Sequence, residues 1–350
     1  MEITKYLITA GLALSLVGCG NEAEVYDNNT SIEEIDTSSV ETTDKEVDKD
    51  VSGDSNNTIT ITDNHGEVVV PKNPQRVVAL DNRTFEILEE FGVDLVAAPK
   101  DVMPDGISYK NDESVENIGN HREPNFEILA AMDPDLVIVG QRFADYYDEI
   151  KELVPNAAII DIDINVSEDA DNPGNNLLEG FKNTTMILGE IFEKEDEASD
   201  LVNRLEESIE KAKSSYNSES VMGLIVSGGE IGYSAPSYGR VWGPIFDILE
   251  LNPSLKVDGD SSDHQGDDIS VEAIAESNPY YLMILDRDAG TNEAAESKPA
   301  EDVIENSQAL ENLEVISQDR IYYAPKDTYT NEYIITFIDI FNGLGDLFNK

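Results

Sequence analysis

The stretch Pro134–Arg142 reads PDLVIVGQR, and it has a counterpart in Pro279–Arg287, which reads PYYLMILDR. An amphipathic helical pattern precedes each stretch, at Phe126–Met132 and at Val271–Ser277. Each then continues as a short apolar run and ends on an arginine eight residues after the proline. A helix that leads into a buried strand is the repeating unit of layered α/β folds. The chain therefore uses this unit at least twice, with a cation after each strand.

Apolar runs rich in β-branched residues alternate with helical patterns along the rest of the chain. This alternation is typical of an α/β fold. Buried strands are expected at Arg76–Leu80, Leu95–Ala98, Leu136–Val139, Ala158–Ile162, Val221–Ser227, Tyr281–Leu285 and Arg320–Ala324, a hairpin at Thr58–Val70, and helices at Thr84–Phe91 and Glu332–Phe348. A long helical region is expected over Asn176–Ser214. We therefore predict two α/β lobes, at 58–175 and 216–350, joined by a helical connection at 176–215.

The N-terminus has the features of an export signal. One lysine is followed by an apolar run from Tyr6 to Val17, which is too short to span a bilayer. The sequence Leu16-Val17-Gly18-Cys19 resembles the lipobox of bacterial lipoproteins, which implies that residues 1–19 contain the signal peptide and that Cys19 carries a lipid. Cys19 is the only cysteine, so an internal disulfide is impossible and no other cysteine is present for metal binding or catalysis.

The chain is strongly acidic throughout. Residues 20–57 are rich in Asp, Glu, Ser, Thr and Asn, and such a composition predicts a disordered tether. The whole sequence has a formal net charge of -50. This charge argues against nucleic acid as a partner, because phosphate binding requires clustered Lys and Arg. It is compatible either with simple solubility or with a salty habitat, in which screening makes the charge tolerable.

Six segments together resemble the siderophore-binding lipoproteins of Gram-positive ABC importers. They are NPQRVVALDNRTFEIL (73–88), NIGNHREPN (117–125), PDLVIVGQRFADYYDEI (134–150), YGRVWGPIFDIL (238–249), DHQGDDISVEAIAESNP (263–279) and DTYTNE (327–332). The wider class also handles haem and vitamin B12, and its two lobes are joined by a long backbone helix, with the ligand in the cleft between them. The resemblance implies a monomeric binding protein without enzymatic activity, lipid-anchored on the extracytoplasmic face of the cell membrane. It also implies an ABC permease and its ATPase as partners, and a ferric siderophore as the ligand.

Five arginines are candidates for binding an anionic ligand. Ligands of open α/β sheets bind beyond the carboxyl ends of the strands, where Arg142, Arg287 and Arg83 are expected. Arg122 and Arg240 lie in glycine-rich loops. The resemblance aligns Arg142 and Arg287 with arginines that surround ferric catecholates in relatives. Arg240 aligns less closely, because the residues after it depart from the usual Phe-Gly. The alternative for each arginine is a structural salt bridge.

Further candidates come from the resemblance and from the loops around these arginines. In some catecholate-binding relatives, a histidine and a tyrosine in loops like those of His264 and Tyr329 complete the coordination of iron. A loop histidine is otherwise a solvated residue, so both roles remain open. Trp242 and Tyr238 are expected to pack against flat rings of a ligand, although Trp242 would serve equally well in a core.

Acidic residues are the candidates for docking on the permease. In this class, a glutamate early in the first helix of a lobe contacts permease arginines. Glu86 matches that pattern in the first lobe, and Asp247 or Glu250 is the candidate in the second.

Several alternatives remain after this interpretation. Haem, cobalamin and hydroxamate siderophores are competing ligands within the class. A free-metal binder would need clustered ligands, but the three histidines are far apart in sequence. A hydrolase is disfavoured because the chain has no Gly-x-Ser-x-Gly elbow. We expect no cofactor of its own, and ferric iron only as part of the siderophore complex.

Overall fold

The computed structural model describes residues 57–120, 122–257, 262–291 and 297–350. All of them belong to one compact unit. The predicted signal peptide and lipobox, and the tether apart from its last residue, lie outside the described residues. None of the helices in the described ranges is both long enough and apolar enough to cross a membrane.

The described part of the chain begins with the predicted hairpin, which is confirmed. Strand β1 (Thr58–Asp63) pairs antiparallel with β2 (Gly66–Pro71). Ile59, Ile61 and Val70 are buried. This is the alternation expected of a ribbon with one face on a core.

The first lobe is built on a parallel sheet of five strands in the order β5-β4-β3-β6-β7. The strands are β3 (Val77–Ala79), β4 (Leu95–Ala98), β5 (Glu116–Asn117), β6 (Leu136–Val139) and β7 (Ala158–Asp161), and the helices are α1 (Phe85–Glu90), α2 (Phe126–Ala131) and α3 (Tyr147–Leu153). All four residues of β6 are buried. The sequence thus predicted every strand here except β5, which has only two residues and both of them exposed.

The second lobe is built on a mixed sheet with the order β10-β8-β11-β12 and with β9 on the other edge of β8. Its elements are β8 (Ser220–Ser227), β9 (Glu230–Ser234), α6 (Trp242–Leu249), β10 (Asn252–Pro253), α7 (Val271–Ser277), β11 (Tyr281–Asp286), α8 (Ala300–Glu305), α9 (Glu314–Ser317), β12 (Ile321–Tyr323) and α10 (Ile334–Phe348). Strand β9 is antiparallel to β8 and was not predicted. The turn at Gly228-Gly229, where both residues have positive φ, is the signal that could have indicated it.

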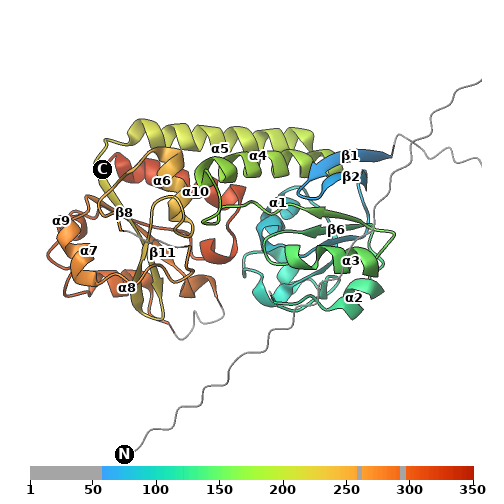
Figure 1. The fold of residues 1–350 in the computed structure, drawn as a ribbon, viewed down its shortest axis with the longest axis horizontal. Coiled ribbons are helices and arrows are strands. Elements are labelled where there is room, and N and C mark those ends of the chain that lie inside the picture. Colours follow the sequence, from blue (N-terminus) through green and yellow to red (C-terminus); the bar gives the residue numbers. More distant parts are fainter. Residues whose placement is uncertain (1–56, 121, 258–261, 292–296) are drawn as a thin grey trace, which may run out of the picture. The chain divides into compact units, whose positions relative to one another are not determined.

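The helical connection consists of two helices, α4 (Pro173–Phe192) and α5 (Glu195–Ser215). Glu193 adopts a left-handed conformation and ends α4, so the chain turns back and α5 packs along α4 (Figure 1). Helix α4 touches both lobes: Gly174 lies against α6, and the carbonyl of Ile191 accepts a hydrogen bond from Asn73. Helix α5 packs against α10.

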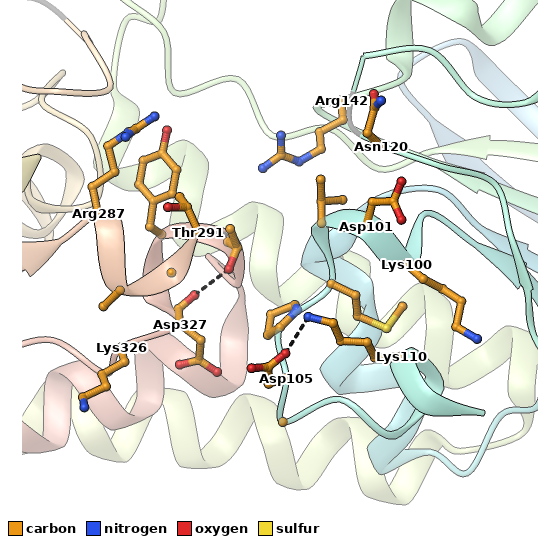
Figure 2. Close-up of a pocket in the computed structure, with 18 of the residues that line it drawn as sticks. Lys100, Asp101, Asp105, Lys110, Asn120, Arg142, Arg287, Thr291, Lys326 and Asp327 are labelled. Atoms are coloured by element: carbon orange, nitrogen blue, oxygen red, sulfur yellow. Dashed lines mark hydrogen bonds and ion pairs between the residues drawn. The ribbon is translucent and has the colours of Figure 1, made fainter. Parts of the chain in front are cut away.

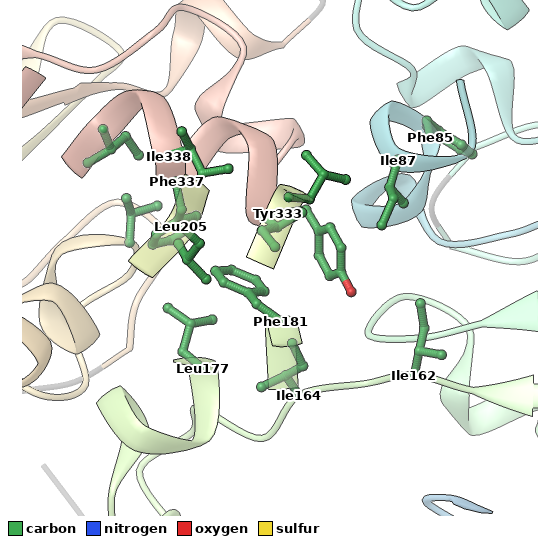
Figure 3. Close-up of a cluster of buried hydrophobic side chains, with 14 of the residues drawn as sticks. Phe85, Ile87, Ile162, Ile164, Leu177, Phe181, Leu205, Tyr333, Phe337 and Ile338 are labelled. Atoms are coloured by element: carbon green, nitrogen blue, oxygen red, sulfur yellow. The ribbon is translucent and has the colours of Figure 1, made fainter. Parts of the chain in front are cut away.

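An aromatic cluster holds this connection to the second lobe. The ring of Phe181, on α4, lies 5.0 Å from that of Tyr333 and 4.9 Å from that of Phe337 (Figure 3). These residues belong to a hydrophobic cluster that also includes Phe85 and Ile87 of α1. The lobes therefore share buried apolar side chains through α4 and α10, which restrains movement between them.

Candidate functional site

The carboxyl ends of β6 and β11 face one cavity of about 1630 Å³, called here the large cavity. It is lined by Lys100–Gly106, Lys110, Asn111, Asn117, Asn120, Arg122, Gln141, Arg142, Arg240, Arg287, Ala289–Thr291, Lys326, Asp327, Tyr329 and Thr330. Arg142 follows β6 and Arg287 follows β11 directly. Figure 2 shows their guanidinium groups pointing into the space from opposite sides. The matched spacing in the sequence thus brings two cations from different lobes to one place.

The cations of the chain are concentrated around this cavity. Seven of the 23 Lys and Arg residues line it, namely Lys100, Lys110, Arg122, Arg142, Arg240, Arg287 and Lys326. Of the acidic residues that the structure describes, only three line it, namely Asp101, Asp105 and Asp327. The large cavity therefore has a local excess of positive charge inside a strongly negative molecule.

Arg142 is held in place by a neutral partner. Its Nε donates to Oδ1 of Asn82 at 2.6 Å, and Nδ2 of Asn82 donates to the carbonyl of Thr330 in the second lobe. Burial lowers the pKa of Arg142, and the charge of Asp81 only partly offsets this. Among the described residues, none forms an ion pair with Arg142. Its charge is therefore available to a ligand.

Arg287 and Arg240 lie over the ring of Tyr329. The guanidinium carbons are 5.2 Å and 4.3 Å, respectively, from the ring centroid. Nη1 of Arg287 also lies 3.3 Å from Oγ of Ser227 and 3.5 Å from Oδ1 of Asp288. Two positive charges thus lie close together at one aromatic ring. The attraction of each guanidinium to the negative face of the ring offsets part of their mutual repulsion.

Arg83 does not line the large cavity, and the structure assigns it the salt-bridge alternative. Its Nη2 donates to Glu332 at 3.1 Å, and its Nη1 lies 3.8 Å from Asp163. Burial alone would lower the pKa of Arg83, but the charges of Glu332 and Asp81 outweigh it and raise the pKa. Arg83 borders a separate space of about 250 Å³, called here the small cavity, which Tyr238 also lines.

Trp242 does not reach either cavity. Its side chain is fully buried, its indole nitrogen donates to the carbonyl of Leu224 at 3.1 Å, and its ring packs edge-on against Tyr322. Of the two roles left open for the only tryptophan, the structure shows the core role. The reason is that α6 begins at Trp242 and directs this side chain against β8.

His264 and Tyr329 are not brought together at the large cavity. Tyr329 lines it, whereas the His264 side chain is half exposed, lies 3.9 Å from Asp263 and is outside the lining of both cavities. Within the described ranges, no group of three or more His, Cys, Asp or Glu residues could hold a metal ion.

The sequence analysis did not name two cations that line the large cavity, although each of them follows a parallel strand, as Arg142 and Arg287 do. Lys100 comes shortly after β4, and Lys326 shortly after β12, so both lie near the carboxyl end of a parallel strand. The ammonium of Lys100 donates to the carbonyls of Asp112 and Val115, and thereby fixes a loop. In Figure 2, Lys100 and Lys326 point away from the space between Arg142 and Arg287.

The three acidic docking candidates differ in exposure. Glu250 is exposed, whereas Asp247 and Glu86 are both partly buried, and Asp247 accepts a hydrogen bond from Ser237. Burial and the nearby charge of Asp327 raise the pKa of Glu86 to about 7. Its Oε2 accepts a hydrogen bond from Thr336 of α10 at 3.2 Å. Glu86 thus lies between α1 and α10, and its role in docking stays a prediction.

Two curated proteins are similar to the chain over most of their length. The petrobactin-binding protein YclQ of Bacillus subtilis is 30% identical over 254 residues, which are 71% of this chain and 76% of YclQ. The ferric-anguibactin-binding protein FatB of Vibrio anguillarum is 29% identical over 270 residues, which are 75% of this chain and 80% of FatB.

The fold leads to the same group of proteins. The structure of the siderophore-binding protein BauB, bound to two acinetobactin molecules and ferric iron, superposes with a TM-score of 0.70 and 26% identity. The match covers 83% of this chain and 98% of BauB. Residues 77–328 match the family described as periplasmic binding protein, and the chain therefore belongs to that family.

Proposed function

We propose that this chain is the substrate-binding component of an ABC importer and that it captures a ferric siderophore in the large cavity. The observation that carries the proposal is the gathering of seven cations around one cavity in a chain with net charge -50. The likeness to YclQ, FatB and BauB, each named for a siderophore or its iron complex, supports it.

The charge of the cavity favours catecholate-type complexes over neutral hydroxamates. A catecholate chelate of ferric iron presents several anionic oxygens, and the planar fork of arginine matches pairs of oxygens. Arg142 and Arg287 approach from different lobes, so one bound anion can contact both. In a partly enclosed site, their attraction is less screened than on the surface. The Tyr329 ring adds a flat surface for packing against an aromatic ligand.

Binding of a panel of compounds tests this function. Equilibrium dialysis against a ferric tricatecholate, a ferric hydroxamate, haem, cobalamin and free metal ions would rank the ligands. We expect the tricatecholate to bind with the highest affinity. Preferential binding of haem or cobalamin would show that the protein is a binding protein of the same class with a ligand other than a siderophore. Binding of a free ion alone would refute the proposed function.

The membrane attachment is a separate part of the proposal. Lipidation of Cys19 would anchor the chain on the extracytoplasmic face of the cell membrane, where a permease and its ATPase complete the importer. We expect Cys19→Ala to move the protein from the membrane fraction to the medium. Retention of this variant by membranes would contradict the anchor.

Docking on the permease is proposed for the exposed acidic surface, with Glu250 as its best placed candidate. Charge reversal by Glu250→Lys should lower uptake of the ferric siderophore and leave its dissociation constant unchanged. Glu86 remains the candidate of the first lobe, but Glu86→Lys would also remove its hydrogen bond with Thr336 of α10, so this variant tests docking less cleanly. A change in the dissociation constant with Glu250→Lys would show that its effect on uptake is not confined to docking.

A further inference from the structure

A buried carboxylate lies next to the large cavity and binds two of the arginines described above. Glu332 precedes α10, and its side chain is 9% exposed. It lines the small cavity, whereas its near neighbours Tyr329 and Thr330 line the large one. The segment 329–332 thus borders both cavities.

Both oxygens of Glu332 are bound to arginines. Oε1 accepts from Nε of Arg240 at 2.5 Å, and Oε2 accepts from Nη2 of Arg83 at 3.1 Å. Arg83 belongs to the first lobe, whereas Arg240 and Glu332 belong to the second. Burial alone would raise the pKa of Glu332, but Arg240 and Arg83 lower it. The carboxylate therefore stays charged and links the two lobes.

Glu332 constrains the orientation of Arg240. Nε of Arg240 donates to Glu332, Nη2 donates to the carbonyl of Tyr329 at 3.3 Å, and the guanidinium lies over the Tyr329 ring. In the part of the chain that the structure describes, Nη1 of Arg240 has no partner. Because Arg240 also lines the large cavity, the N–H groups of Nη1 and the second N–H of Nη2 remain as donors for a ligand.

We propose that Glu332 is a positioning residue, which orients Arg240 toward the ligand and fixes it relative to Arg83 of the other lobe. This inference rests on the proposed function, and it assigns a role to a residue that does not line the large cavity itself. Fixing a flexible side chain before binding removes part of the entropy that binding would otherwise cost. A purely electrostatic role predicts the opposite effect, because loss of the carboxylate makes the site more positive and favours an anion.

A double-mutant cycle with a hexadentate ferric tricatecholate separates these roles. Glu332→Gln should raise the dissociation constant by roughly five- to tenfold in the native background and by less than about twofold in an Arg240→Ala background. Glu332→Asp, which keeps the charge on a shorter side chain, should restore part of the affinity. Equal losses in both backgrounds would indicate general damage, and unchanged or tighter binding of Glu332→Gln would refute positioning.

Two further measurements keep the test decisive. If Glu332→Gln alone does not fold, the double variant Arg83→Met/Glu332→Gln takes its place in the cycle. This variant removes one positive and one negative charge together, so it leaves no buried charge unpaired at Arg83. The Nε–H resonance of Arg240 reports the contact without any ligand, and it should be protected from exchange in the native chain and lose that protection in Glu332→Gln. An unprotected native resonance would overturn the inference. If the native chain shows protection but does not bind the tricatecholate, the proposed function fails and the contact stands.

Discussion

The large and small cavities both contain buried or partly buried arginines, yet they use them in opposite ways. In the large cavity, Arg142 is held by the neutral side chain of Asn82 and forms no ion pair with any described residue. At the small cavity, Arg83 shares the carboxylate of Glu332 with Arg240, which lines both cavities. The first region therefore retains uncompensated positive charge, whereas the second is close to neutral.

This difference shows what determines the role of an arginine in an acidic protein. Carboxylates are abundant in this chain, so an arginine remains available only where neutral side chains or carbonyls occupy its surroundings. Asn82 serves this purpose for Arg142. The local environment, and not the residue type, separates an arginine that is available to a ligand from a structural one.

Removal of Arg83, the arginine that forms structural ion pairs, should have the largest effect and tests the comparison most directly. Arg83→Met should lower the free energy of unfolding by roughly 3 kcal/mol, because Glu332 stays buried with one of its two partners lost. Urea unfolding measures it, with Arg204→Met on the exposed face of α5 as the matched control. A loss no greater than that of the control would show that Arg83 is not needed structurally.

Removal of a cavity arginine should act on binding instead. Arg142→Ala and Arg287→Ala should each weaken binding of a ferric tricatecholate by roughly ten- to a hundredfold, because each would remove a charge-assisted hydrogen bond worth about 1.5–3 kcal/mol. The double variant should lose less than the sum, since both side chains contact one anion. Lysine at either position should restore only part of the affinity. Two single variants with native affinity would return both arginines to structural roles.

A partly buried glutamate, Glu86, extends the comparison with Glu332. Among the described residues, Glu86 forms no ion pair, and its pKa is raised to about 7 from 4.5. A raised carboxyl pKa costs nothing below pH 4.5, where both states are protonated, and it destabilises increasingly as pH rises through 7. Glu86→Gln should therefore stabilise the protein by about 2 kcal/mol at pH 8 and hardly at all at pH 4. The difference between native and variant unfolding free energies, measured across this range, tests it, and a difference independent of pH would contradict it.

The smallest expected effect concerns the aromatic ring that two arginines share. Tyr329→Leu should weaken ligand binding about two- to fivefold, because the ring interactions with Arg240 and Arg287 are worth about 0.5–1 kcal/mol. Tyr329→Phe keeps the ring and should bind like the native chain if packing is its only role. A large loss with Tyr329→Phe, accompanied by a changed iron absorption band, would instead indicate that the phenolate ligates iron.

Local patterns in the sequence predicted most of the fold. Strands β3, β4, β6, β7, β8, β11 and β12 lie within the predicted runs or within a residue of them. The helical connection was predicted as one region, and the break at Glu193 was missed because no glycine or proline marks it. The last helix is predicted to begin at Glu332 but begins at Ile334, so Glu332 lies in the segment before it.

The sequence by itself determined the alternation of strands and helices, and with it the placement of Arg142 and Arg287 at the carboxyl ends of two strands. Burial and backbone hydrogen bonding repeat over a few residues, so these features can be read locally. Only the tertiary structure decided which arginine meets a carboxylate, because Arg83 and Glu332 are 249 positions apart. An ion pair needs a separation of a few ångströms between its charged groups. Because the chain has 73 acidic residues, only the packing of the lobes determines which carboxylate lies that close to a given arginine.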